Sequence, residues 1–161
     1  MKLHFNTLLI IAALSFTASS CSGAKDNKSE APDNVTTIKA DADLRGQWAI
    51  ENIVFNDSDY VRPDEAVSGT IQYIVFDDST YSIMTNCNSI SGSYTVKGDS
   101  LTLHDGLMTE MACDNMETED ALRRILPDIT SVDIQNDSVV RLNGKTPAEC
   151  ILLRKLKTPL K

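Results

Sequence analysis

The side chains that could carry chemistry are few in this chain of 161 residues. There are four cysteines, at positions 21, 87, 113 and 150, and of the two histidines only His104 lies beyond residue 20. A dithiol redox site usually has two cysteines separated by two residues, and no such pair is present. One histidine beyond residue 20 cannot supply a multi-histidine zinc site, and a Ser-His-Asp triad would depend on His104 alone. The sequence therefore predicts no metal site and no cofactor.

Carboxylates are abundant but form no recognisable site. The chain has 23 Asp and Glu residues. Asp57, Asp59, Asp64 and Glu65 are close in sequence, but the glycine and the spacing of a calcium loop are missing, so we interpret residues 56–68 as a solvated acidic loop. Glycosidase chemistry needs two carboxylates facing across a cleft, and a single sequence cannot pair them. We therefore predict no enzyme activity, with a hydrolase that uses such acids as an alternative.

The first 21 residues have the pattern of an export signal. Lys2 precedes an apolar run at residues 8–16, which is shorter than the roughly 20 residues of a membrane-spanning helix. The series ASSC ending at Cys21 resembles the lipobox of bacterial lipoproteins, with Ala at its first position, and there the cysteine carries the lipid. We predict a signal peptide at residues 1–20 and lipidation of Cys21, with palmitate among its acyl chains. A secreted protein with an incidental cysteine is the alternative.

Residues 21–43 are polar and small, which predicts a flexible tether. Ser22 resembles the residue that follows the cysteine in lipoproteins sorted to the outer membrane. We therefore expect a lipid-anchored outer-membrane protein that faces the periplasm. The formal net charge is −8, and loss of Lys2 with the signal peptide would make it −9. Such a surface repels phosphate backbones and anionic headgroups, so we expect no nucleic-acid partner and attachment to the membrane through the lipid alone.

Residues 44–157 have the size of one small domain with one core. The hairpin at residues 94–104 alternates most regularly, with Tyr94 and Leu101 on one face and His104 on the other. Trp48 is interpreted as a core anchor, and the alternation of its strand slips near Asn52. Many short strands with close turns favour an antiparallel barrel or sandwich. The eight predicted strands cover residues 44–55, 70–76, 80–86, 94–97, 101–104, 130–135, 138–143 and 150–156.

One helix is predicted between Asp114 and Pro127. Asp114 can cap its first turn, which is acidic, two arginines lie in its last turn, and Pro127 ends it. The apolar residues of this segment repeat at helical spacing and predict a stripe that packs on the sheet. They are Leu122, Ile125 and Leu126.

Three short series resemble the META domain family, also called HslJ-like. They are NCN at residues 86–88, GSY at residues 92–94 and TEMAC at residues 109–113, and the outline matches over the whole of residues 44–157. The family often has a proline after the second cysteine, where this chain has Asp114. The resemblance implies a small conical antiparallel β-barrel of about eight strands with one α-helix. It also implies a place among bacterial envelope lipoproteins and stress-associated proteins, with no established activity or cofactor.

The resemblance also bears on the cysteines, because Cys87 and Cys113 lie in two of its motif segments. A disulfide between them would close a loop of about 27 residues and stabilise the fold by roughly 3 to 4 kcal/mol in an oxidising compartment. Two reduced core cysteines are the alternative. Cys150 begins an apolar strand, which is typical of a buried thiol.

The polar residues of the motif segments allow two interpretations. Their side chains can satisfy backbone groups at a tight strand crossing, with Gly92 as a point of close approach, or they can rim a binding surface. We favour the first interpretation. The residues concerned are Asn86, Asn88, Ser91, Thr109 and Glu110.

The function expected is that of a monomeric, non-catalytic binding or assembly module in envelope maintenance or stress response. Its expected partner is another envelope protein. The alternative is a carrier of a small apolar ligand or acyl chain, because an eight-stranded barrel can hold one when side chains do not fill its interior.

Overall fold

The computed structural model describes residues 41–160. The described residues belong to one compact unit. The predicted signal peptide, the lipidation of Cys21 and the tether up to residue 40 lie outside them. The last tether residues contact the domain: the backbone N–H of Ala42 donates to the carbonyl of Gly98 at 3.0 Å.

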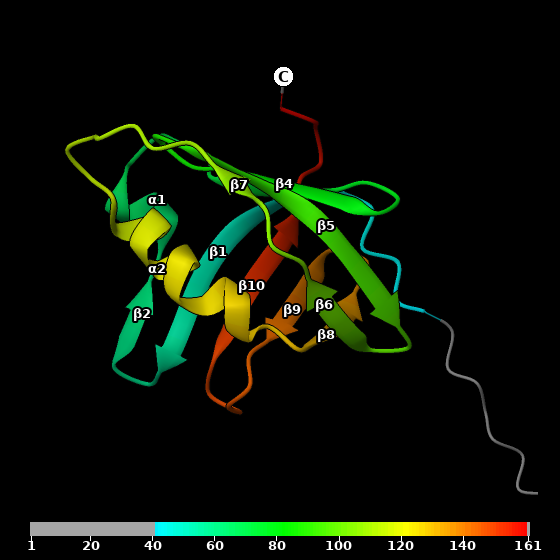
Figure 1. Ribbon diagram of the computed structural model, residues 1–161. Helices are drawn as coiled ribbons and strands as arrows, with labels where there is room; N and C mark the ends of the chain where they lie inside the picture. The colour runs from blue at the N-terminus through cyan, green and yellow to red at the C-terminus, as the bar shows by residue number, and fades with distance from the viewer. Residues whose placement is uncertain (1–40, 161) are drawn as a thin grey trace, which may run out of the picture. The chain divides into compact units, whose positions relative to one another are not determined.

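Antiparallel strands form one sheet in the described part of the chain, and eight of them close into a barrel (Figure 1). The order around the ring is β1-β3-β4-β5-β6-β8-β9-β10, and β10 pairs with β1 to close it. This confirms the predicted fold class, a mainly β antiparallel barrel of eight strands. The strands are β1 (Gly46–Asn56), β2 (Asp59–Val61), β3 (Tyr73–Phe76), β4 (Thr80–Met84), β5 (Ser89–Lys97), β6 (Ser100–Leu103), β7 (Leu107–Met108), β8 (Ser131–Asn136), β9 (Val139–Asn143) and β10 (Cys150–Lys155).

Three details of the strands follow the sequence prediction. The register of β1 against β10 shifts between Ile50 and Asn52, where the alternation slips. In the hairpin of β5 and β6, Tyr94 and Leu101 are buried while His104 is exposed. Trp48 is buried, as predicted for a core anchor, and its indole N–H donates to the carbonyl of Leu44 at 2.7 Å.

The prediction of a plain loop at residues 56–68 is wrong. This segment contains β2, which turns back to pair with β1, and the single helical turn α1 (Pro63–Ala66). The turn between the strands is set by Asn56, whose side-chain oxygen accepts the backbone N–H of Ser58 at 3.0 Å. Pro63 occupies the first turn of α1, where a proline costs no hydrogen bond. Both elements were missed because the acidic composition of the segment is typical of a solvated loop.

The predicted helix begins later than expected. It is α2 (Glu117–Ile125), and it continues into the 3₁₀ turn η1 (Leu126–Asp128). Asn115 rather than Asp114 serves its start, because the side-chain oxygen of Asn115 accepts the backbone N–H of Glu117 at 3.0 Å. Leu122 and Ile125 are buried as predicted, while Leu126 is only half-buried.

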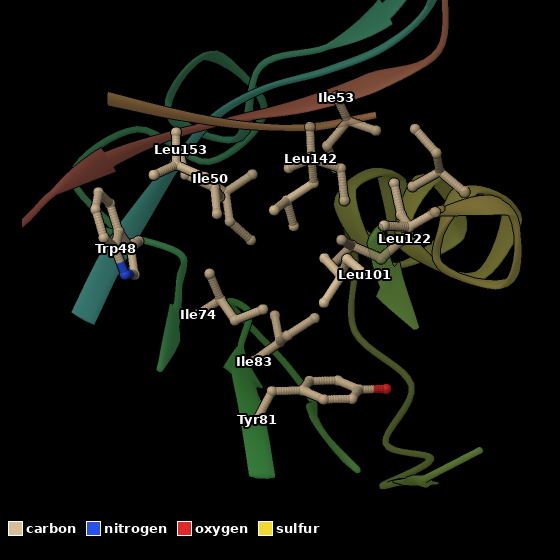
Figure 2. Packing of buried hydrophobic residues seen from close by; sticks show 14 of the residues in the cluster. Trp48, Ile50, Ile53, Ile74, Tyr81, Ile83, Leu101, Leu122, Leu142 and Leu153 are labelled. Carbon is tan, nitrogen blue, oxygen red and sulfur yellow. The ribbon is translucent and has the colours of Figure 1, made fainter. Parts of the chain in front are cut away.

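Side chains fill the interior of the barrel (Figure 2). Leu122 reaches in from α2 and points toward Leu101 and Leu142, and Ile53, Leu142 and Leu153 are 0% exposed. An enclosed apolar ligand would need an interior that side chains leave empty. The packed core therefore argues against a carrier with its ligand inside the barrel.

Strand β5 shares one edge between two partners, β6 and then β7. The two are separated at residues 104–106, where the chain comes very close to β5. A Cβ atom added at Gly106 would lie 1.9 Å from the carbonyl oxygen of Ser91. Only glycine therefore permits β7 to pair at this distance.

Gly106→Ala is expected to lower the free energy of unfolding by about 2 kcal/mol, because the added methyl group meets backbone that cannot rotate away. Urea denaturation of both proteins would measure the difference. Leu107→Ala at the next residue is the matched control, since Leu107 is 80% exposed. A loss of equal size in both variants would contradict the steric explanation.

Candidate functional site

The motif segments meet where the loop between β4 and β5, residues 85–88, lies under a long connection between β6 and α2. We call this connection, residues 104–116, the arch. Asn88 joins the two. Its side-chain oxygen accepts the backbone N–H of Met111 and the hydroxyl of Thr109, both at 2.8 Å, and its side-chain N–H donates to the carbonyl of Met111 at 2.9 Å. Asn88 is 3% exposed, so its side-chain amide is buried and its hydrogen bonds hold the arch.

The other polar motif residues divide into two groups. Asn86 donates its side-chain N–H to the carbonyl of Asn115 at 3.0 Å, and the Thr109 hydroxyl accepts the backbone N–H of Ser89 at 3.0 Å. These two, like Asn88, satisfy backbone groups. Ser91 and Glu110 are exposed and could meet a partner.

A buried carboxylate completes this arrangement. Glu119 on α2 is 0% exposed, and its Oε1 accepts the backbone N–H of Asn88 at 2.8 Å and the hydroxyl of Thr85. It thereby fixes the loop at residues 85–88 to the helix. Sequence reasoning did not assign it this role. The available signal was its spacing, since a residue three positions before Leu122 lies on the buried face of a helix.

The cysteines fasten the same two segments. Cys87 and Cys113 are joined by a disulfide with a Cα–Cα distance of 6.2 Å across a sequence separation of 26. Of the two interpretations of this pair, the structure has the disulfide. Cys113 lies at the surface, whereas Cys150 is a free, buried thiol.

A crevice opens beside the arch, between β6 and β7 on one side and the end of α2 with η1 on the other. Its volume is about 180 Å³. Tyr81 and Ile90 form its buried floor, and burial together with the nearby charge of Asp105 raises the pKa of the Tyr81 phenol. Its other lining residues are Leu103, His104, Asp105, Gly106, Met108, Arg123, Leu126 and Pro127.

The candidate catalytic and metal-binding residues do not converge. His104 is exposed at the rim of the crevice, with its Nε2 3.4 Å from the hydroxyl of Thr95. Of the predicted acidic loop, Asp59 pairs with Arg124 at 2.8 Å and Glu65 with Arg62 at 2.9 Å. Within residues 41–160, no group of three His, Cys, Asp or Glu side chains is arranged to hold a metal ion. The same residues include no helix with the length and apolar character needed to span a membrane.

The fold and the site define a class of protein: a small antiparallel β-barrel with a filled core and a disulfide-fastened arch. The META domain model matches residues 42–156, so the chain belongs to the META domain family. This match confirms the resemblance drawn from the three motif series.

Comparison with a solved structure supports the fold. The chain is similar to a protein from Burkholderia xenovorans, solved by NMR, with 20% sequence identity and a TM-score of 0.58 over 86% of this chain and 100% of the other. A DUF4847 family protein from Bacteroides vulgatus is 12% identical with a TM-score of 0.49, over 71% of this chain and 94% of the other. None of the curated proteins matches the chain.

Proposed function

We propose that this META domain is a monomeric, non-catalytic binding or assembly module. It would be lipid-anchored through Cys21 at the outer membrane, facing the periplasm, and would serve envelope maintenance or stress response through an envelope protein partner. The observation that carries the proposal is the hydrogen bonding of the Asn88 side chain. A catalytic amide must be free to meet a substrate, and all three contacts of this one go to the arch.

Exposed apolar side chains on and beside the arch support a binding role. Leu107 is 80% exposed and Met111 is 57% exposed. Flexible methionine side chains and exposed apolar residues are common where one protein contacts another. The arch is held rigidly by the disulfide and by Asn88, so it can present these side chains without a large ordering cost.

Chemical crosslinking in intact envelopes, followed by affinity purification and mass spectrometry, tests this function. A stoichiometric protein partner that is lost in Leu107→Asp would support the proposal. Ile134→Asp is the matched control, because Ile134 is an exposed apolar residue on β8 at 42% exposure and lies outside the arch. A retained lipid with no protein partner would instead support the carrier. Turnover of a defined substrate that is abolished by one carboxylate substitution, with the fold intact, would support the hydrolase.

The lipid anchor makes a separate prediction. Cys21→Ser should abolish labelling with radioactive palmitate and release the protein into the soluble periplasmic fraction, because no acyl chain would hold it at the membrane. Cys150→Ser is the control and should label normally, since Cys150 is buried in β10. Continued labelling of the Cys21→Ser protein would contradict lipidation at Cys21.

A further inference from the structure

The barrel has a seam where two neighbouring strands stop pairing. The only residue pair between β6 and β8 is Ser100 with Ser131. Two backbone bonds flank it, from the N–H of Leu101 to the carbonyl of Thr130 at 3.0 Å and from the N–H of Val132 to the carbonyl of Asp99 at 2.8 Å. Past Leu101, η1 and the end of α2 replace β8 across the gap, and the crevice lies between them and β6. The ring is therefore closed at one end of this seam and open along the rest.

The strand edge that borders the seam has unused backbone groups. In an antiparallel pair, residues alternate between those that bond the partner and those whose N–H and C=O point the other way. His104 and Thr109 donate their N–H groups to β5, to the carbonyls of Ser93 and Ser89. Leu103 and Met108 are the adjacent alternate residues, so their backbone groups point into the seam. Within residues 41–160, neither residue pairs with any strand other than β5.

The crevice behind this edge has the size of one side chain. Clefts that hold whole small molecules measure about 300 to 1,000 Å³, whereas this one measures about 180 Å³. Its floor and walls are mainly apolar, with Ile90 and Leu103 from the sheet and Leu126 from η1. One apolar side chain fits it better than an acyl chain does.

A single unpaired cation lines the helix side. Arg123 is exposed, lines the crevice and has no ion pair among the described residues. Its neighbour Arg124 is fully engaged, with Asp59 at 2.8 Å and the ring of Phe55 3.7 Å from its guanidinium carbon. Asp105 and His104 lie on the opposite, strand side of the crevice. A guanidinium in this position is complementary to a carboxylate held against the helix wall.

We propose that this seam binds an extended peptide segment of a partner protein by strand addition. The main chain of the segment pairs with Leu103 and Met108, one apolar side chain enters the crevice, and a neighbouring carboxylate meets Arg123. The carboxylate is either an acidic side chain or the C-terminus of the partner. This inference rests on the proposed function as a binding module and gives it a location and a partner chemistry.

The free edge is tested first, by amide hydrogen exchange of the full chain measured by NMR. The amides of Leu103 and Met108 should exchange rapidly, while those of His104 and Thr109, which are bonded to β5, should be protected. Protection of Leu103 and Met108 in the free protein would show that the edge is already occupied and would overturn the proposal.

The ligand is then tested with two libraries of displayed random octapeptides, one with free C-termini and one with the peptide internal to its carrier. Enriched peptides should protect the amides of Leu103 and Met108. Arg123→Gln should weaken their binding about tenfold, as expected for loss of a charge-assisted contact. Lys97→Gln removes the same charge from an exposed side chain at the end of β5 and should leave binding unchanged.

Each outcome of the selection has a distinct meaning. Enrichment from the free C-terminus library alone identifies the terminal carboxylate, and enrichment from both identifies an acidic side chain. The proposed binding at the seam is contradicted if the peptides bind without protecting Leu103 and Met108, or bind equally well to Arg123→Gln. The protein would still be a binding module in that case. Failure to enrich any peptide contradicts peptide binding at the seam. The crosslinking experiment in envelopes tests the proposed role as a binding module independently.

Discussion

Leu122→Ala should lower the free energy of unfolding by about 2 to 5 kcal/mol, the range seen when a buried leucine leaves a cavity. Leu122 is 0% exposed and is the side chain by which α2 enters the core. The surrounding residues come from strands fixed in a closed ring, so they have little freedom to collapse into the space. Urea denaturation followed by tryptophan fluorescence would measure the loss, since the only tryptophan is in the core.

Leu126→Ala is the matched control for this substitution. It removes the same atoms from the next turn of the same segment, but Leu126 is only half-buried, at the rim of the crevice. Its cost should be about 1 kcal/mol, because less apolar surface returns to water. Equal losses from the two variants would mean that α2 does not plug the barrel as described.

Removal of the disulfide should have an effect of similar size. The double substitution Cys87→Ser and Cys113→Ser is expected to lower the free energy of unfolding by about 3 to 4 kcal/mol in the chain-entropy model, since the bond closes a loop of sequence separation 26. The arch should also loosen, because the disulfide and Asn88 hold the same stretch. Denaturation midpoints and amide exchange across residues 104–116 would measure both effects.

A reducing agent provides the control for the disulfide. It should destabilise the original protein to the level of the double serine variant and leave that variant unchanged, because the remaining described cysteine, Cys150, is a free thiol. Cys113 lies at the surface, so the bond is open to reduction in the folded protein. An unchanged midpoint after complete reduction would show that the arch is held by its hydrogen bonds alone.

The sequence predicts the barrel well because the signals of its strands are local. Each of the eight strands of the ring was predicted at least in part from alternation, from β-branched content and from turn residues, and so was the slip near Asn52. The predicted start of β5 was too late, because this strand begins at Ser89 rather than at Tyr94. Short elements without such signals were missed. β2 has three residues, two of them polar or aromatic with no clear alternation, and β7 has two residues. Their existence depends on partners that lie far away in the chain.

The site is harder to predict, because its polar residues are defined by what surrounds them. The sequence places Glu119 in the acidic first turn of the predicted helix and does not show its burial, yet the carboxylate is fully buried and bonded to the loop at residues 85–88. Gln72 is buried as well, and its side-chain oxygen accepts the backbone N–H of Asn86 at 3.3 Å. The seam depends on where β6 and β8 stop pairing. The apolar residues of both strands alternate in the sequence on either side of that point, so the sequence pattern does not mark it.

The ring closes between its earliest and latest strands, with Trp48 of β1 opposite Lys155 of β10. No nascent chain can complete this barrel before its final segment has been synthesised, and contacts that span so much sequence form slowly. The barrel therefore remains incomplete until translation ends. A product clipped before β10 would be an open sheet with two unpaired edges, which are templates for pairing with other chains.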